Sequence, residues 1–136
     1  MPTAVPLTLH LLVLIGLYDL AAGVAGLTGG ISWSAIIDEF DRSPALTFVT
    51  GFMAFIVGGV IILTHFVWTD PLAIIVSAIG WIAAVEGLLI MAVPRPLFAL
   101  TRPLVGNQKL VSLFAAAVGL ALIVLGLTGR ADPTLI

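Results

Sequence analysis

Two carboxylates, Asp19 and Glu86, stand inside long apolar stretches of a chain with few charged residues. Asp19 lies in LIGLYDLAAGVAGL, and Glu86 lies in WIAAVEGLLIMAV. A charge near the centre of a bilayer costs roughly 2.5 to 3.5 kcal/mol on insertion scales, so such a group turns inward, finds a partner or stays protonated. No lysine or arginine lies at a matching depth. The two acids therefore predict either a proton or cation site or an interhelical hydrogen bond, within the protein or to another subunit.

Two aromatic side chains in the same stretches carry polar hydrogens. Tyr18 directly precedes Asp19, and Trp81 lies five residues before Glu86. A phenol hydroxyl or an indole N–H is able to donate to a buried carboxylate. We therefore group Tyr18 with the two acids as candidates for an ion or proton site.

The two histidines, His10 and His65, are expected at similar depth in the membrane. His10 is near the start of the first apolar stretch and His65 is near the end of the second. Histidines on neighbouring antiparallel helices can hold a haem or a metal ion, or take part in quinone chemistry. The alternative is a pair of ordinary histidines at the membrane interface. No third ligand or haem-attachment pattern accompanies them, so we expect no metal and no cofactor.

Other chemistry has little to work with in this sequence. There is no cysteine, no glycine-rich phosphate loop, no histidine pair at zinc spacing, and no serine or threonine nucleophile beside a plausible base. Five basic and seven acidic residues give a formal net charge of −2, which offers no basic surface for nucleic acid. We expect a protein that is not an enzyme and does not bind nucleic acid.

The composition places the chain in the membrane class. Hydrophobic residues make up 61% of its 136 residues and charged residues only 9%. Four apolar segments are long enough to span a bilayer, at about residues 7–28, 45–68, 72–93 and 110–128. Capping residues with or without proline, Ser43-Pro44, Asp70-Pro71 and Asn107, open the last three. The sequence predicts one transmembrane domain over residues 1–136, an all-α integral membrane four-helix bundle.

Two longer connections, at about residues 31–42 and 95–105, are amphipathic. In the first, apolar residues recur at i, i+3, i+4 and i+7; they are Trp33, Ile36, Ile37 and Phe40. This spacing is typical of a helix that lies in the membrane interface. Trp33 and Trp68 are expected as interfacial anchors on opposite sides. An even number of crossings separates the two connections, so both lie on one side of the membrane.

The basic residues predict the orientation of the chain. Arg42, Arg95, Arg102 and Lys109 lie on the side of the two amphipathic connections, and only Arg130 lies on the other. Basic loops stay in the cytoplasm. We therefore expect the loops at residues 29–44 and 94–109 to be cytoplasmic and both termini to be periplasmic or external.

Every span carries two glycines seven residues apart. The pairs are Gly16 and Gly23, Gly51 and Gly58, Gly80 and Gly87, and Gly119 and Gly126. Two helical turns separate the members of a pair, so each pair lies on nearly one face and lets a neighbouring backbone approach closely. A shift of 64 residues places Gly16 on Gly80 and Gly23 on Gly87, which raises the hypothesis of two parallel helix-hairpin repeats joined by amphipathic interfacial connections.

Two segments carry a resemblance to a known group of proteins. IIDEFDRSPALTF, residues 36–48, and WIAAVEGLLIMAVPRPL, residues 81–97, resemble small four-span bacterial inner-membrane proteins, conserved membrane proteins of unknown function. The resemblance implies four helices and a bacterial inner (plasma) membrane. It transfers no catalytic or binding residue.

We expect a non-enzymatic accessory or scaffold subunit that packs in the lipid bilayer against other membrane protein subunits or forms a homo-oligomer. The glycine pairs and the small number of polar residues favour this function. One alternative is a small oligomeric proton- or cation-coupled transporter or channel that uses Asp19 and Glu86. A second alternative is a subunit of a redox complex that uses His10 and His65.

Overall fold

The computed structural model describes residues 1–132 and 134. These residues contain six helices and one pair of short strands. In chain order they are β1 (Pro2–Thr3), α1 (Pro6–Leu27), α2 (Trp33–Arg42), α3 (Pro44–Thr64), α4 (Pro71–Ala92), α5 (Pro94–Thr101), α6 (Gln108–Thr128) and β2 (Arg130–Ala131). The helices α1, α3, α4 and α6 are each long and apolar enough to cross a membrane. The expected all-α membrane bundle is confirmed, and the chain is a multi-pass membrane protein.

The starts of the helices follow from local sequence. Proline occupies the first turn of α1, α3 and α4. The side chain of Ser43 accepts a hydrogen bond from the N–H of Leu46, and Asn107 does the same for Leu110. These caps satisfy backbone donors that have no partner inside the helix.

The second span ends four residues earlier than we expected, at Thr64. The reason is Ser77 of α4, whose hydroxyl donates to the carbonyl of Val67 at 2.8 Å and accepts from the N–H of Val67 at 3.3 Å. These hydrogen bonds hold the connection of residues 65–70 in a non-helical path beside the start of α4.

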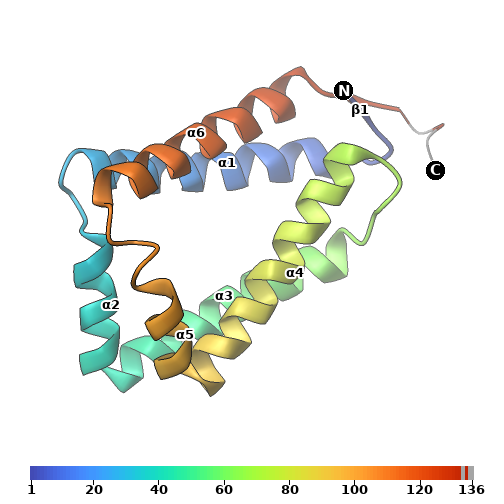
Figure 1. Cartoon of the computed structure of the whole chain (residues 1–136). Coiled ribbons are helices and arrows are strands. Elements are labelled where there is room, and N and C mark those ends of the chain that lie inside the picture. Colours follow the sequence, from blue (N-terminus) through green and yellow to red (C-terminus); the bar gives the residue numbers. More distant parts are fainter. Residues whose placement is uncertain (133, 135–136) are drawn as a thin grey trace.

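The four spans pack as two antiparallel pairs, α1 with α6 and α3 with α4 (Figure 1). The eight glycines that lie seven residues apart, two in each span, are all buried. In the first pair, a Cβ on Gly16 would lie 2.6 Å from the carbonyl oxygen of Gly119. In the second pair, a Cβ on Gly51 would lie 2.8 Å from the carbonyl oxygen of Gly87. Each pair is therefore joined along a seam where only glycine fits.

This pairing differs from the hairpin repeats that the sequence favours. Helices α3 and α6 are both 21 residues long and begin 64 residues apart, at Pro44 and Gln108, so the halves do correspond. However, each half contributes its first span to one pair and its second span to the other. The two halves interlock because α2 and α5, placed between the spans of each half, keep those spans apart.

The two pairs meet at one end of the molecule and diverge toward the other (Figure 1). A core cluster marks the end where they meet; it consists of Leu12, Ile61, Leu72, Val76 and Leu122. Helices α2 and α5 lie at the opposite end, where the ring of Phe40 stacks on Phe98 with centroids 5.4 Å apart. The bundle is thus closed at both ends by different contacts.

The two ends of the described chain lie together at the end where the pairs meet. Strands β1 and β2 pair in parallel, with Pro2 opposite Arg130 and Thr3 opposite Ala131. The N–H of Arg130 donates to the carbonyl of Met1, and that of Asp132 donates to Thr3. This pairing was not predicted, since two residues are too few for a strand pattern in the sequence.

Gly58 and Gly59 offer a matched test of the seams. A Cβ on Gly58 would overlap the backbone nitrogen of Ala84, whereas a Cβ on Gly59 would meet nothing within 4 Å. We expect Gly58→Ala to lower the free energy of unfolding by about 1–3 kcal/mol through overpacking. Gly59→Ala should leave it unchanged or raise it by up to about 1 kcal/mol, because alanine favours helix. Unfolding by SDS in mixed micelles, followed by circular dichroism, measures both, and equal losses would contradict the seam.

Candidate functional site

Asp19 and Glu86 continue the faces along which α1 and α4 meet. Leu12 and Ile15 of α1 and Ile79 of α4 belong to the core cluster and its packed neighbours. Asp19 follows Leu12 by seven residues and Ile15 by four, and Glu86 follows Ile79 by seven. Residues at these separations share a helix face. The two carboxylates therefore lie on the facing sides of the two helix pairs, beyond the point where the pairs diverge.

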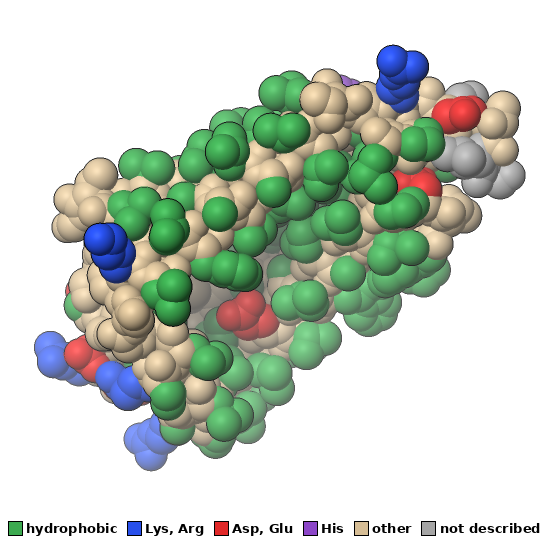
Figure 2. All heavy atoms as spheres, turned by 45° about the horizontal axis from the view of Figure 1, so that its top comes forward, with side chains coloured by type: hydrophobic (Ala, Val, Ile, Leu, Met, Phe, Trp, Pro, Cys, Tyr) green, Lys and Arg blue, Asp and Glu red, His purple; other side chains and the backbone are tan. Residues whose placement is uncertain are grey.

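We call the space flanked by Asp19 of α1 and Glu86 of α4 the wedge. Figure 2 shows the molecular surface hollowed between α6 and α4, with an acidic side chain in the hollow. Asp19 is half-buried and Glu86 is exposed. Within residues 1–132 and 134, neither carboxylate has a hydrogen bond or an ion pair. The wedge is thus a space at membrane depth that presents two acids without basic partners.

Tyr18 and Trp81 do not serve these acids. Tyr18 is 74% exposed and Trp81 is also exposed, and within residues 1–132 and 134 neither side chain is hydrogen-bonded to Asp19 or Glu86. At 100° per residue, Tyr18 points about 100° away from Asp19, and Trp81 about 140° away from Glu86. The two carboxylates therefore have no aromatic hydrogen-bond donor among the described residues.

The two histidines have unlike surroundings. His10 is exposed on α1, whereas His65, in the connection between α3 and α4, is only 1% exposed. The Nε2 atom of His65 lies 2.6 Å from the hydroxyl of Thr8, and Nδ1 lies 3.1 Å from the hydroxyl of Ser77. Both ring nitrogens have protein partners, so the ring has no nitrogen left for a haem or a metal ion.

The hydroxyl of Ser77 lies at the centre of the contacts around His65. It is 2.8 Å from the carbonyl of Val67 and 3.1 Å from both the carbonyl and Nδ1 of His65. In a neutral histidine one ring nitrogen donates and the other accepts, and the hydroxyls of Ser77 and Thr8 are able to serve both. A neutral histidine thus connects α1, the connection of residues 65–70 and α4.

Asp70 extends this polar cluster toward the N-terminus. One carboxylate oxygen accepts from the N–H of Ala73 at 2.9 Å and caps α4. The other accepts from the hydroxyl of Thr3 at 3.1 Å and the N–H of Ala4 at 3.0 Å. Burial alone would raise the pKa of Asp70, but the hydrogen bonds from Ala4, Ala73 and Thr3 outweigh it and hold the pKa below its usual range. Asp70 is a structural anion in this cluster.

Thr3, Thr8 and Ser77 also belong to this cluster and were not predicted from the sequence. All three are buried hydroxyl residues near the start of an apolar helix. Serine and threonine in membrane helices often bond their own backbone, so their type alone does not indicate a partner. Their positions at the end of the bundle that also holds His65 and Asp70 become apparent only once α1 and α4 are adjacent. Among the described residues, no group of three His, Asp or Glu could hold a metal ion.

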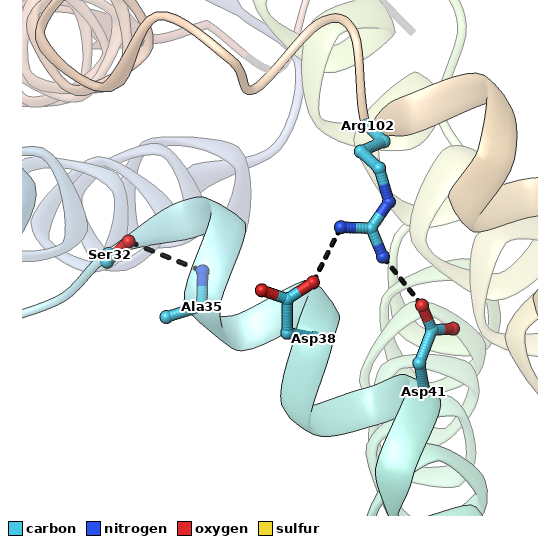
Figure 3. A network of polar contacts seen from close by, with 5 residues as sticks. All are labelled: Ser32, Ala35, Asp38, Asp41 and Arg102. Carbon is cyan, nitrogen blue, oxygen red and sulfur yellow. Dashed lines mark hydrogen bonds and ion pairs between the residues drawn. The ribbon is translucent and has the colours of Figure 1, made fainter.

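At the opposite end, α2 and α5 are joined by ion pairs. Figure 3 shows Arg102 between Asp38 and Asp41, with N–O distances of 2.6 Å to each carboxylate. Exposed pairs of this kind contribute little stability singly, but one guanidinium with two carboxylates fixes the orientation of α2 relative to the chain after α5. The close-up also shows the cap of α2, in which Ser32 accepts from Ala35.

The apolar face of α2 packs within the protein. Ile37 is buried in a cluster with Ile90 and Phe98, and Phe40 packs beside it, while Ile36 is half-buried. The indole N–H of Trp33 donates to the hydroxyl of Ser112 at 2.9 Å. Trp68, at the other end, is exposed. The amphipathic pattern of α2 therefore reflects contacts with α4, α5 and α6.

Comparisons with protein-family models, with curated proteins and with solved structures find no match to this chain. Three features of the molecule bear on its function: the wedge acids, the buried His65 cluster and the contacts between α2 and α5. The wedge combines membrane depth with charged groups that have no protein partner within residues 1–132 and 134.

The burial of His65 makes a testable contribution to pH dependence. Burial lowers the pKa of His65 below its ordinary value of 6.5. Below pH 6.5 the folded state then binds fewer protons than the unfolded state. The contribution of neutral His65 to the free energy of unfolding is therefore complete above pH 6.5 and is lost as the pH falls below that value. We expect the thermal unfolding temperature in detergent to decrease as the pH is lowered from 7 to 5. His65→Asn should make this dependence on pH weaker.

His10→Asn is the matched control, because His10 is exposed on α1. It should keep the pH slope of the wild type. A constant loss of stability in His65→Asn does not affect the comparison, since the slope and not the midpoint is compared. An unchanged slope in His65→Asn would contradict the buried neutral histidine.

Proposed function

We propose that this chain is a non-enzymatic accessory or scaffold subunit of a membrane complex, and that the wedge receives one transmembrane helix of a partner protein. The observation that supports the proposal is that α1 and α4 are in contact at one end and separate toward the other. The faces that join them at one end continue without a partner helix and bear Asp19 and Glu86. A helix placed there would bury both faces and satisfy both acids.

The glycine seams do not supply this partner surface. We expected them to favour packing against other subunits, but all eight glycines are occupied within the α1–α6 and α3–α4 pairs. This corrects the main argument from sequence for a scaffold. The proposal rests instead on the wedge, whose facing sides lack such a seam.

Charge indicates the chemistry of the partner. Two carboxylates at membrane depth favour a basic side chain opposite them, because an ion pair or charge-assisted hydrogen bond removes the cost of an isolated charge. A second copy of this chain has no such residue to offer. Its five basic residues lie outside the spans or, in the case of Lys109, in the first turn of α6. The partner is thus a different protein with lysine or arginine in a transmembrane helix.

The distribution of basic residues supports an orientation. Arg42, Arg95, Arg102 and Lys109 belong to the end formed by α2 and α5, and Arg130 belongs to the end with the termini. In Figure 2 the charged side chains are concentrated at the two ends, and apolar side chains cover the surface between them. We infer that the α2–α5 end is cytoplasmic and that the termini are external. The resemblance noted in the sequence favours a bacterial inner membrane.

A photo-crosslinking residue at Ala83 tests the partner directly. Ala83 lies between Ile79 and Glu86 on the wedge face of α4. In native membranes it should crosslink to one membrane protein, within a helix that contains lysine or arginine. The same residue at Leu63, which is 86% exposed on the outside of α3, is the control and should not give this product.

Charge removal completes the test. Asp19→Asn combined with Glu86→Gln should reduce the Ala83 crosslink at least about fivefold, since each lost charge pair is worth on the order of 1 kcal/mol or more. His10→Asn should leave it unchanged. A crosslink between two copies of this chain, or no protein product from Ala83, would overturn the proposal.

A proton- or cation-coupled pathway is the second candidate, favoured by the absence of basic partners for Asp19 and Glu86 among the described residues. In liposomes that contain only the purified protein, this function requires a pH-driven flux that Asp19→Asn and Glu86→Gln each abolish. A flux that both variants leave unchanged would contradict it. The occupied ring nitrogens of His65 give no support to the redox alternative.

A further inference from the structure

A groove with a charged rim runs along the α2–α5 end of the molecule. It consists of two adjoining hollows of about 320 and 350 Å³, which share Asp41, Arg95 and Phe98. The larger hollow is also lined by Phe48 and Met91. The groove therefore has an apolar part on α3 and α4 and a basic part on α5.

The groove crosses the boundary of the membrane. Phe48 lies in the second turn of α3, and Met91 lies in the last turn of α4, so both belong to membrane spans. Arg95 lies just beyond the end of α4, on α5. Phe48 and Met91 are then level with lipid acyl chains, while Arg95 is level with lipid headgroups.

Arg95 is the cation of this groove that is available to a ligand. Arg102, the other basic residue of the lining, is already held by Asp38 and Asp41 at 2.6 Å each. These contacts also occupy Asp41, the acid of the groove. In the part of the chain that the structure describes, Arg95 has no ion pair. A guanidinium at headgroup depth above an apolar slot is complementary to a phosphate that carries an acyl chain.

We propose that this groove binds an anionic phospholipid, with its phosphate on Arg95 and one acyl chain along Phe48 and Met91. The site is formed entirely by α2, α3, α4 and α5 and is separate from the wedge. It does not depend on the function proposed above, and the failure of one leaves the other untouched.

Native mass spectrometry of the purified protein in detergent tests the site, with phosphatidylglycerol and phosphatidylcholine as probes. The wild type should bind phosphatidylglycerol more tightly than phosphatidylcholine. Arg95→Gln should weaken phosphatidylglycerol binding roughly fivefold and leave phosphatidylcholine binding unchanged, as expected for one basic residue at a lipid headgroup. Arg95→Lys keeps the charge and should retain most of the preference.

Arg130→Gln, at the opposite end of the molecule, is the matched control and should bind both lipids like the wild type. Because Arg95 is exposed, its substitution should leave the fold intact, and circular dichroism checks this. Equal affinity of the wild type for the two lipids, or unchanged phosphatidylglycerol binding in Arg95→Gln, would overturn the proposal. Displacement of the lipid by millimolar inorganic phosphate would also overturn it, because the groove would then bind phosphate without the acyl chain.

Discussion

The close approach of helix backbones at glycine is the contact on which this structure depends. In a bilayer, burying apolar side chains between helices gains little, because lipid tails are equally apolar. Stability therefore comes from the number of atoms brought into van der Waals contact, and glycine maximises it. The α1–α6 and α3–α4 seams meet this condition along most of their length. Each pair forms one closely packed unit, and the rest of the structure holds the two units together.

Two unlike sets of contacts hold the units. At the end with the termini, an apolar core joins α1 and α4, and His65 adds directional hydrogen bonds to Thr8 and Ser77. At the other end, α2 and α5 are joined by the stacked rings of Phe40 and Phe98 and by the ion pairs of Arg102. The first set is buried, whereas the second combines the buried ring of Phe98 with the exposed ion pairs of Arg102. The wedge lies between them because neither set extends along the middle of the spans.

Much of this fold could be read from local sequence, and its pairing could not. Prolines and capping residues determine where helices begin, and hydropathy determines that four of them span a membrane, since both are properties of short segments. The face that carries Gly16 and Gly23 was likewise evident from spacing. Which helix that face meets depends on all four spans at once, and a spacing pattern holds no such information. The buried role of His65 was missed for the same reason, because its partners Thr8 and Ser77 belong to other helices.

The pairing of α1 with α6 also has a consequence for the order of assembly. Helix α1 leaves the ribosome before α3 and α4, and its partner α6 leaves it after them. The α3–α4 pair, by contrast, is joined by only six residues and is able to form as soon as α4 is inserted. Until α6 is inserted, the glycine face of α1 has no helix partner in the bilayer. The pairing of β1 with β2 follows later still, because β2 comes after α6 in the chain.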